Sequence, residues 1–385
     1  MTTEQMLTQD DLEQSVLLAP EVTLDQIGSH ANMSPWEVPR SLGLLSLAYL
    51  RNLPRIPAIT MEMMAERTES PEFKAAIEQH FEVDCTETDG ITRRAWFIPA
   101  KNGLQVEAET IVMLPGLSVQ HHTGLGRENL WEFHQQLPDH NLLAIGSEGL
   151  ESSIPPKDWY NDTSFASQAR GRLEMIDQLK GTLLHSSLDE YHIVGESMGT
   201  VMGFLMAAQA KDYGQTVTEM VAIAPAGIED TGLVELGHKF VLPEAVDLIS
   251  RIYSTPVDRV GYYLRTLLGT ANINPAAIPV MKKHVQLLAS KPAPLQGIGE
   301  QLPKDLVIKI LAGDCDFVAN PRAFYDRLAK MHGNSSLHIY PGEHHMSLTR
   351  SHKMARRTAD VMSETPQASI SVQVHQAGER VITRI

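Results

Sequence analysis

The chain has 385 residues, of which 43% are apolar and 21% are charged, which is the composition of an ordinary globular protein and excludes disorder along its whole length. It carries 47 acidic and 32 basic residues, so its formal net charge is −15 at pH 7. A field of that sign repels phosphate backbones, and nucleic acid is therefore excluded as an expected partner.

The start of the chain and its cysteine content predict a cytoplasmic protein with no integral membrane segment. The first residues, MTTEQMLTQDDLEQ, carry acids where a secretory signal would carry basic and then apolar residues. The longest apolar candidate, SLGLLSLAYL, is about half of the roughly 18 to 20 residues that a span needs, and we interpret it as a buried helix. Cys85 and Cys315 are too few for a disulfide framework or a thiolate metal site.

Residues 1–75 are predicted to form an N-terminal helical extension, because prolines punctuate them and no alternating strand pattern occurs. Two strands are expected next, joined as a hairpin near Asp89-Gly90. Short apolar runs then alternate with segments of helix length: EAETIVMLPG, NLLAIGSEG, EYHIVGES, EMVAIAPAG, DLVIKILAGDCD and SSLHIYPGEHH. Such strands are typical of a parallel sheet with helices on both faces and a ligand site at the carboxyl ends of the strands.

Residues 228–302 interrupt this rhythm with helix-like segments, and we predict that they form a helical lid. The segments HKFVLPEAVDLISRIY and VMKKHVQLLAS space their apolar residues as amphipathic faces. If those faces cover the strand ends, the substrate has a substantial apolar part; alternatively, they attach the lid to the core. The last segment, 366–385, is predicted to be either a terminal hairpin or a frayed tail.

The stretch YHIVGESMGT contains the first candidate for chemistry, a serine between two glycines. Gly195-Glu196-Ser197-Met198-Gly199 fits the pattern G-x-S-x-G, with a strand before it and a helix pattern after it. A Cβ at either glycine would collide as strand and helix close on each other, so the turn pushes Ser197 outward. The N–H of Met198 falls at the start of the helix, where unpaired donors and the helix dipole stabilise an oxyanion.

Candidate acids and bases follow at later strand ends, as a serine nucleophile requires. Asp314 and Asp316 come directly after the run LVIKILAG, and His344 and His345 come after LHIYPGE. The order Ser, Asp, His along the chain is the one expected of an α/β-hydrolase.

On these motifs the chain resembles a lidded, esterase-like serine hydrolase of the α/β-hydrolase superfamily, from about Phe81 to Ser363. The resemblance implies an α/β-hydrolase fold: a mostly parallel sheet with helices on both faces, formed by residues 76–227 and 303–365. The lid interrupts this core, and the N-terminal extension precedes it.

The resemblance also selects residues for the acid and the base. The family's acid lies three residues after the glycine that ends its strand, which implies Asp316, with Asp314 and Asp230 as alternatives. The family's histidine follows the pattern G-x-G-H, which implies His345 if His344 stands where the second glycine normally does. His344 remains the alternative base.

The family's second oxyanion donor comes from the loop after an early strand. Here that loop reads PGLS, with proline in place of the usual histidine, and it implies the N–H of Leu117 beside that of Met198. The later loop SEGLESS resembles the family's Gly-x-Gly-x-Ser loop but keeps one glycine, so it supports the fold more than the chemistry.

The resemblance implies hydrolysis of a carboxylic ester or related acyl bond in a small molecule, through an acyl-enzyme formed on Ser197. Thioesterases, acyltransferases and carbon–carbon bond hydrolases use the same machinery, and a non-catalytic small-molecule-binding protein on this fold is the alternative.

No cofactor or metal is expected. Phosphate-binding and dinucleotide-binding motifs are absent from the sequence, and the adjacent histidine pairs His121-His122 and His344-His345 lack a familiar metal-ligand spacing. The sequence leaves homo-oligomerisation open.

Overall fold

The computed structural model describes residues 81–101, 108–117, 124–180, 188–236, 239, 275–314, 316, 318, 323, 327, 332, 334–341, 343, 345, 354–364, 371–376 and 379–384. The predicted N-terminal extension, much of the predicted lid, and His344 lie outside the described residues. No helix among the described residues is long and apolar enough to cross a membrane.

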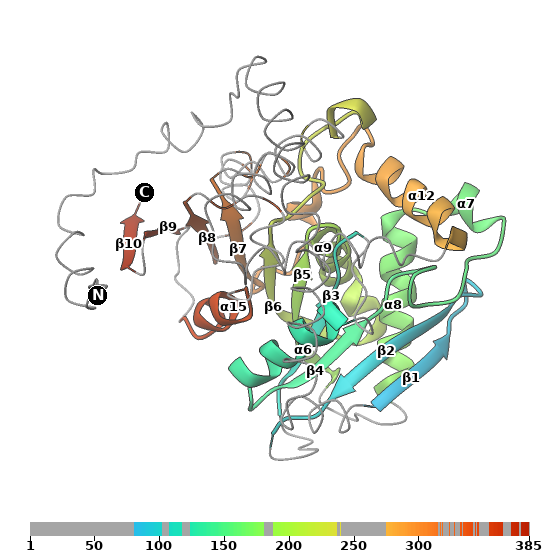
Figure 1. Ribbon diagram of the computed structural model, residues 1–385, viewed down its shortest axis with the longest axis horizontal. Helices are drawn as coiled ribbons and strands as arrows, with labels where there is room; N and C mark the ends of the chain where they lie inside the picture. Colours follow the sequence, from blue (N-terminus) through green and yellow to red (C-terminus); the bar gives the residue numbers. More distant parts are fainter. Residues whose placement is uncertain are drawn as a thin grey trace, which may run out of the picture.

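A ten-stranded sheet forms the centre of the protein, with the order β1-β2-β4-β3-β5-β6-β7-β8-β9-β10 (Figure 1). Its strands are β1 Phe81–Thr86, β2 Thr92–Ile98, β3 Thr110–Leu114, β4 Asn141–Ile145, β5 Glu190–Glu196, β6 Thr216–Ile223, β7 Val307–Gly313, β8 Ser335–Tyr340, β9 Ser371–Gln376 and β10 Glu379–Arg384. Pairing is parallel from β4 through β3 to β9 and antiparallel at both edges. The predicted mostly parallel sheet is confirmed.

Hairpins form both edges of the sheet. The predicted first hairpin is confirmed: β1 and β2 pair antiparallel with Thr86 opposite Thr92, and Gly90 in the connection has a φ of 74°. At the other edge β9 pairs parallel with β8, and β10 returns antiparallel along β9. Of the two forms predicted for the last segment, the structure thus has the hairpin.

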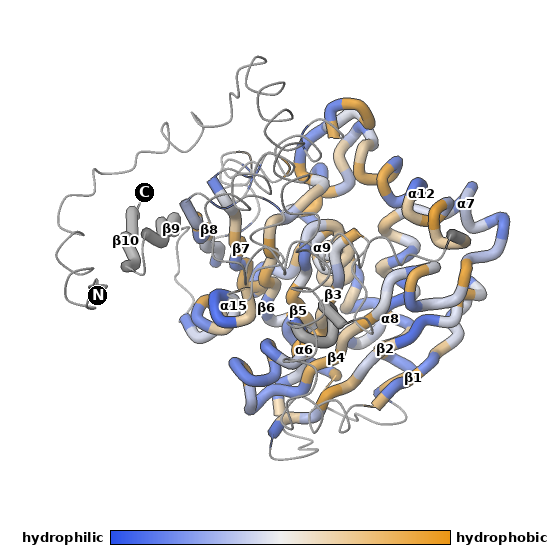
Figure 2. Tube along the Cα trace, viewed as in Figure 1, coloured by the Kyte–Doolittle hydropathy of each residue, from blue (hydrophilic) through white to orange (hydrophobic). Residues whose placement is uncertain are grey.

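Helices lie on both faces of the sheet, and the alternation of side chains along each strand separates the two layers. The helices are α6 Gly124–Gln136, α7 Trp159–Asp162, α8 Phe165–Leu179, α9 Met198–Gln209, α12 Ile278–Leu288 and α15 Met354–Met362, with short 3₁₀ turns at Ala210–Tyr213, Pro275–Ala277 and Ile298–Glu300. In β3, Val112 and Leu114 belong to the cluster with α8 and α9, whereas Ile111 and Met113 belong to the cluster with α6 and α15. The central strands are apolar along their length because neither face meets water (Figure 2).

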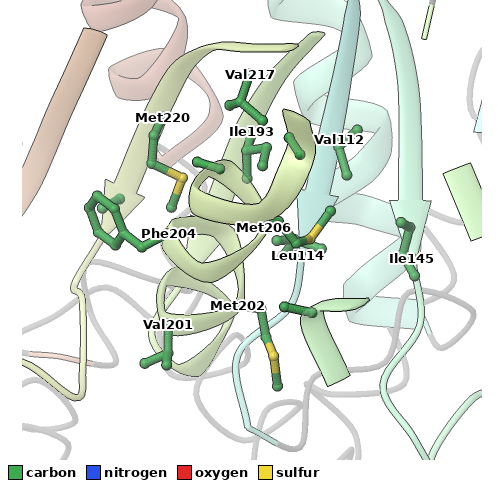
Figure 3. Packing of buried hydrophobic residues seen from close by; sticks show 14 of the residues in the cluster. Val112, Leu114, Ile145, Ile193, Val201, Met202, Phe204, Met206, Val217 and Met220 are labelled. Atoms are coloured by element: carbon green, nitrogen blue, oxygen red, sulfur yellow. The ribbon is translucent and has the colours of Figure 1, made fainter. Parts of the chain in front are cut away.

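Among the described helices, α9 is the most apolar, and it packs directly on the middle of the sheet. Figure 3 shows its residues Phe204 and Met206 beside strand residues that include Ile193 and Met220. Nine of its twelve residues are buried, so its position relative to β5 is closely fixed. This fixes the turn that joins β5 to α9.

Helix α12, the last helix of the predicted lid, is attached to the core. It buries Val280, His284 and Leu288, which are spaced four residues apart and therefore share one face. Leu288 belongs to the core cluster, and Leu287 packs against it. The apolar residues of α12 attach it to the core, in agreement with the second of the two interpretations of this segment, whereas the lid itself stays a prediction.

Candidate active site

Ser197 occupies the sharp turn between β5 and α9. Its φ of 50° and ψ of −111° are strained values for a residue with a side chain. A Cβ on Gly195 would lie 2.8 Å from the carbonyl oxygen of Gly199, and one on Gly199 would lie 2.9 Å from the carbonyl oxygen of Pro115 and closer still to that of Leu114. Backbone atoms cannot yield to such contacts, so both positions require glycine, as the sequence predicted.

The structure brings Ser197, His345 and Asp316 together from three strand ends. Ser197 Oγ lies 2.8 Å from His345 Nε2, and His345 Nδ1 lies 2.9 Å from Asp316 Oδ2. Asp316 and His345 are both buried, with exposed fractions of 4% and 3%. A carboxylate only accepts hydrogen bonds, so Nδ1 carries the proton and Nε2 is left to accept one from the serine hydroxyl.

Backbone contacts in the loop after β7 orient the carboxylate of Asp316. Its N–H donates to the carbonyl of Gly313 at 3.3 Å, and its Oδ1 accepts the N–H of Val318 at 2.9 Å. The loop therefore directs Oδ2 at the imidazole. The alternative acids make other contacts: the N–H of Asp314 donates to Tyr340 O at 3.4 Å, and the carboxylate of Asp230 accepts the N–H of Ala293 at 2.7 Å.

The loop that carries His345 is attached to α15. Glu343, two residues before the histidine, accepts a hydrogen bond from Arg357 at 2.8 Å. The guanidinium carbon of Arg357 also lies 4.4 Å from the centre of the Tyr340 ring at the end of β8. Both contacts lie on the amino-terminal side of His345 and connect that part of the loop to α15.

Of the two residues expected to supply oxyanion donors, Met198 follows Ser197 directly and Leu117 follows a turn that lies beside it. Met198 is the first residue of α9, so its N–H has no carbonyl partner within the helix. The turn before Leu117 runs alongside Ser197, since a Cβ added to Gly116 would lie 3.3 Å from Ser197 Cβ. The N–H of Ser197 itself donates to Ile223 O at 2.9 Å and is not available as a donor.

A buried charge network lies in the loop after β4, and sequence reasoning missed it. Glu148, in SEGLESS, is fully buried. It accepts hydrogen bonds from Arg172 at 2.6 and 2.9 Å and from Arg93 at 3.1 Å. Burial alone would raise the pKa of Glu148, but the two guanidinium groups hold it well below its usual value. One feature of the sequence could have indicated this network. In the run ITRRAWFI, Arg93 lies on the same face of the strand as the apolar residues Ala95 and Phe97, so it points into the core.

The network also extends to α12. His284 Nε2 lies 3.0 Å from Gln168 Oε1, and its ring stacks on Phe165 with the ring centres 6.3 Å apart. Burial lowers the pKa of His284 to about 4, so the imidazole is neutral at pH 7. The polar contacts of α12 thus add to its apolar attachment.

Known structures share this arrangement of sheet and helices. A meta-cleavage product hydrolase from Pseudomonas fluorescens is 16% identical over 73% of this chain and 97% of its own, with a TM-score of 0.50. An enol-lactonase from Burkholderia xenovorans is 14% identical over 73% of this chain and 100% of its own, with a TM-score of 0.51. A carboxyl esterase from Bacillus coagulans is 14% identical over 74% of this chain and 96% of its own, with a TM-score of 0.50.

No family model and no curated protein sequence matches the chain. The structural likeness at these identities establishes the fold: the chain has the α/β-hydrolase fold that its sequence predicted.

Proposed function

We propose that the protein is a serine hydrolase that cleaves a carboxylic ester or a related acyl bond through an acyl-enzyme. The proposal rests on two successive contacts. Ser197 Oγ contacts His345 Nε2, and His345 Nδ1 contacts Asp316 Oδ2. A hydroxyl is a weak nucleophile near neutral pH, and this chain of two hydrogen bonds is the arrangement that activates it.

In the proposed reaction Ser197 Oγ attacks the acyl carbon while its proton passes to His345 Nε2. Asp316 Oδ2 accepts a hydrogen bond from His345 Nδ1–H and stabilises the imidazolium. The N–H groups of Leu117 and Met198 bind the oxyanion. The leaving group then takes the proton from Nε2, and a water molecule, deprotonated by the same nitrogen, releases the acid and restores the serine.

The substrate is a small molecule with an acyl group. The structural neighbours described above are named as a meta-cleavage product hydrolase, an enol-lactonase and a carboxyl esterase; a lactone is a cyclic ester, so two of the three names refer to carboxylic esters. We favour an ester because it needs no acceptor other than water, whereas a thioesterase or acyltransferase needs a particular leaving group or acceptor. The cytoplasmic location stays a prediction from the sequence.

Turnover of p-nitrophenyl esters of increasing acyl length, with the intact chain, tests the proposal. Ser197→Ala should lower kcat by about 10⁴ to 10⁶ without unfolding the protein, since the glycines rather than the hydroxyl set the turn. A fluorophosphonate should label the wild type once, at Ser197, and leave the variant unlabelled.

Ser147→Ala is the matched control, because that serine is also buried at a strand end and its Oγ has no hydrogen-bond partner among the described residues. It should retain activity and labelling. More than about a tenth of wild-type activity in Ser197→Ala would exclude the serine mechanism. A folded wild type with neither turnover nor labelling would favour the non-catalytic binding protein.

A further inference from the structure

We propose that Glu109, His140 and His192 form a zinc site at the amino-terminal ends of the parallel strands, whereas Ser197 lies at their carboxyl ends. Glu109 directly precedes β3, His140 directly precedes β4, and His192 is the third residue of β5. These three strands are neighbours in the sheet, so their amino-terminal ends bring the side chains together. Ser197 lies five residues further along β5, about 16 Å away along the strand at roughly 3.3 Å per residue.

The separations of the candidate ligand atoms suit a tetrahedral zinc ion. Glu109 Oε2 lies 3.2 Å from His192 Nε2 and 3.4 Å from His140 Nε2. With zinc–ligand bonds of about 2.0 to 2.1 Å, the edges of the tetrahedron are about 3.3 to 3.4 Å long. One ligand atom from each residue lies within 4.8 Å of the other two, so small side-chain rotations complete the set. Two imidazoles and one carboxylate form a ligand set known from zinc proteins.

Thr218 lies where it can support the tautomer of His192 that zinc requires. Its hydroxyl has one hydrogen and lies 3.3 Å from the carbonyl of Tyr191 and 3.1 Å from His192 Nδ1. When the hydroxyl donates to the carbonyl it accepts from Nδ1–H, and the neutral ring presents a lone pair at Nε2. In the other tautomer Nε2–H donates to Glu109 Oε2, 3.2 Å away, and zinc binding displaces that hydrogen.

The surroundings leave the site an entry path. Glu219, opposite His192 across β5 and β6, is paired with Lys309 at 3.0 Å, so its charge is balanced and the metal would rest on the three ligands alone. The side chain of Glu109 is 69% exposed, whereas those of His140 and His192 are 25% and 17% exposed. An ion can therefore enter from solvent, and water can fill a fourth position.

A zinc ion here would join the ends of three adjacent strands and so stabilise the fold, since a ligand that binds the folded state raises its stability. The sequence expectation of no metal was based on adjacent histidine pairs. It did not include this site because its ligands are separated by 31 and 52 residues and come from three different strands.

Equilibrium dialysis of the chelator-treated, full-length chain against Zn²⁺, with metal counted by mass spectrometry, tests the proposal. We expect one zinc per chain, a melting temperature that rises with zinc concentration, and the visible absorption of tetrahedral Co²⁺ after cobalt substitution. Glu109→Gln and His192→Gln should abolish all three. Thr218→Val, which removes no ligand, should weaken zinc binding by about 10- to 100-fold because it releases the His192 ring.

Glu190→Gln is the matched control: it removes an exposed carboxylate from the same strand, two residues before His192, and should bind zinc like the wild type. Zinc binding that is absent from the wild type would overturn the proposal in favour of a protonated ion pair. Zinc binding that Glu109→Gln and Thr218→Val leave unchanged would overturn it as well, because the metal would then be bound by other residues.

Discussion

Replacing Arg93 with methionine should destabilise the protein far more than replacing its neighbour Arg94, although both arginines form ion pairs on strand β2. The Arg93 side chain is fully buried and donates to Glu87 at 2.9 Å, Asp89 at 2.7 Å and Glu148 at 3.1 Å. The Arg94 side chain is 42% exposed, and its hydrogen bonds of 2.8 Å to Asp84 lie in solvent. The two pairs thus differ in burial more than in distance.

The magnitude follows from what each substitution leaves behind. Removing one partner of a buried ion pair costs about 3 to 5 kcal/mol, because the other charge remains buried without compensation. Without Arg93, Glu148 keeps one of its two arginines, and Glu87 and Asp89 lose the guanidinium that they share. Exposed pairs contribute about 0 to 1 kcal/mol, because water and salt screen them. We therefore expect a loss of about 4 kcal/mol for Arg93→Met and below about 1 kcal/mol for Arg94→Met.

Urea unfolding, followed by circular dichroism and by tryptophan fluorescence, measures the difference. With a slope of about 3 to 4 kcal/mol per molar urea for a chain of this size, the midpoint of Arg93→Met should fall by about 1 M. That of Arg94→Met should shift by less than about 0.3 M. Equal shifts in the two variants, or a larger shift in Arg94→Met, would refute the argument from burial.

Three further predictions concern the site and its surroundings. In the same ester assay, His345→Ala should be nearly inactive, whereas His344→Ala should keep its activity. Equal residual activities of the two variants would show that the assignment of His345 as the base is wrong. Gly199→Ala should lose activity and fluorophosphonate labelling, because its Cβ meets the carbonyl oxygens of two residues in the turn after β3; full labelling would contradict the steric reasoning. His284, with a folded pKa of about 4 against 6.5 when free, binds its proton more readily in the unfolded chain, so its contribution to stability is lost as the pH falls from 6.5 to 4. In urea titrations between pH 6.5 and 4, the free energy of unfolding of His284→Gln should fall less steeply than that of the wild type. An unchanged pH profile in this variant would contradict the role given to His284.

Several features of the protein follow from local rules that the sequence alone expresses. Continuous apolar runs separated by helix lengths predict covered parallel strands, because a strand buried on both faces has no polar side. The pattern around Ser197 predicts its turn, because a strand that reverses directly into a helix needs glycines there; Gly195 meets backbone atoms of the same short unit, whereas Gly199 meets the end of the neighbouring strand β3. The order of serine, acid and histidine along the chain indicates the superfamily in the same way.

Only the tertiary structure decided which polar residues meet. Sequence spacing left Asp316, Asp314 and Asp230 as candidate acids, and the fold of the loop after β7 directs the first of them at His345. The network around Glu148 joins residues from a hairpin strand, a loop and two helices.

Glu109, His140 and His192 likewise come from segments that no short motif connects. Strand order in the sheet follows from the packing of the whole core, and it places residues far apart in the chain side by side. A local pattern carries no information about that order. The turn at Ser197 could therefore be predicted from the sequence, whereas the buried charge network and the three residues at the amino-terminal ends of β3, β4 and β5 required the structure.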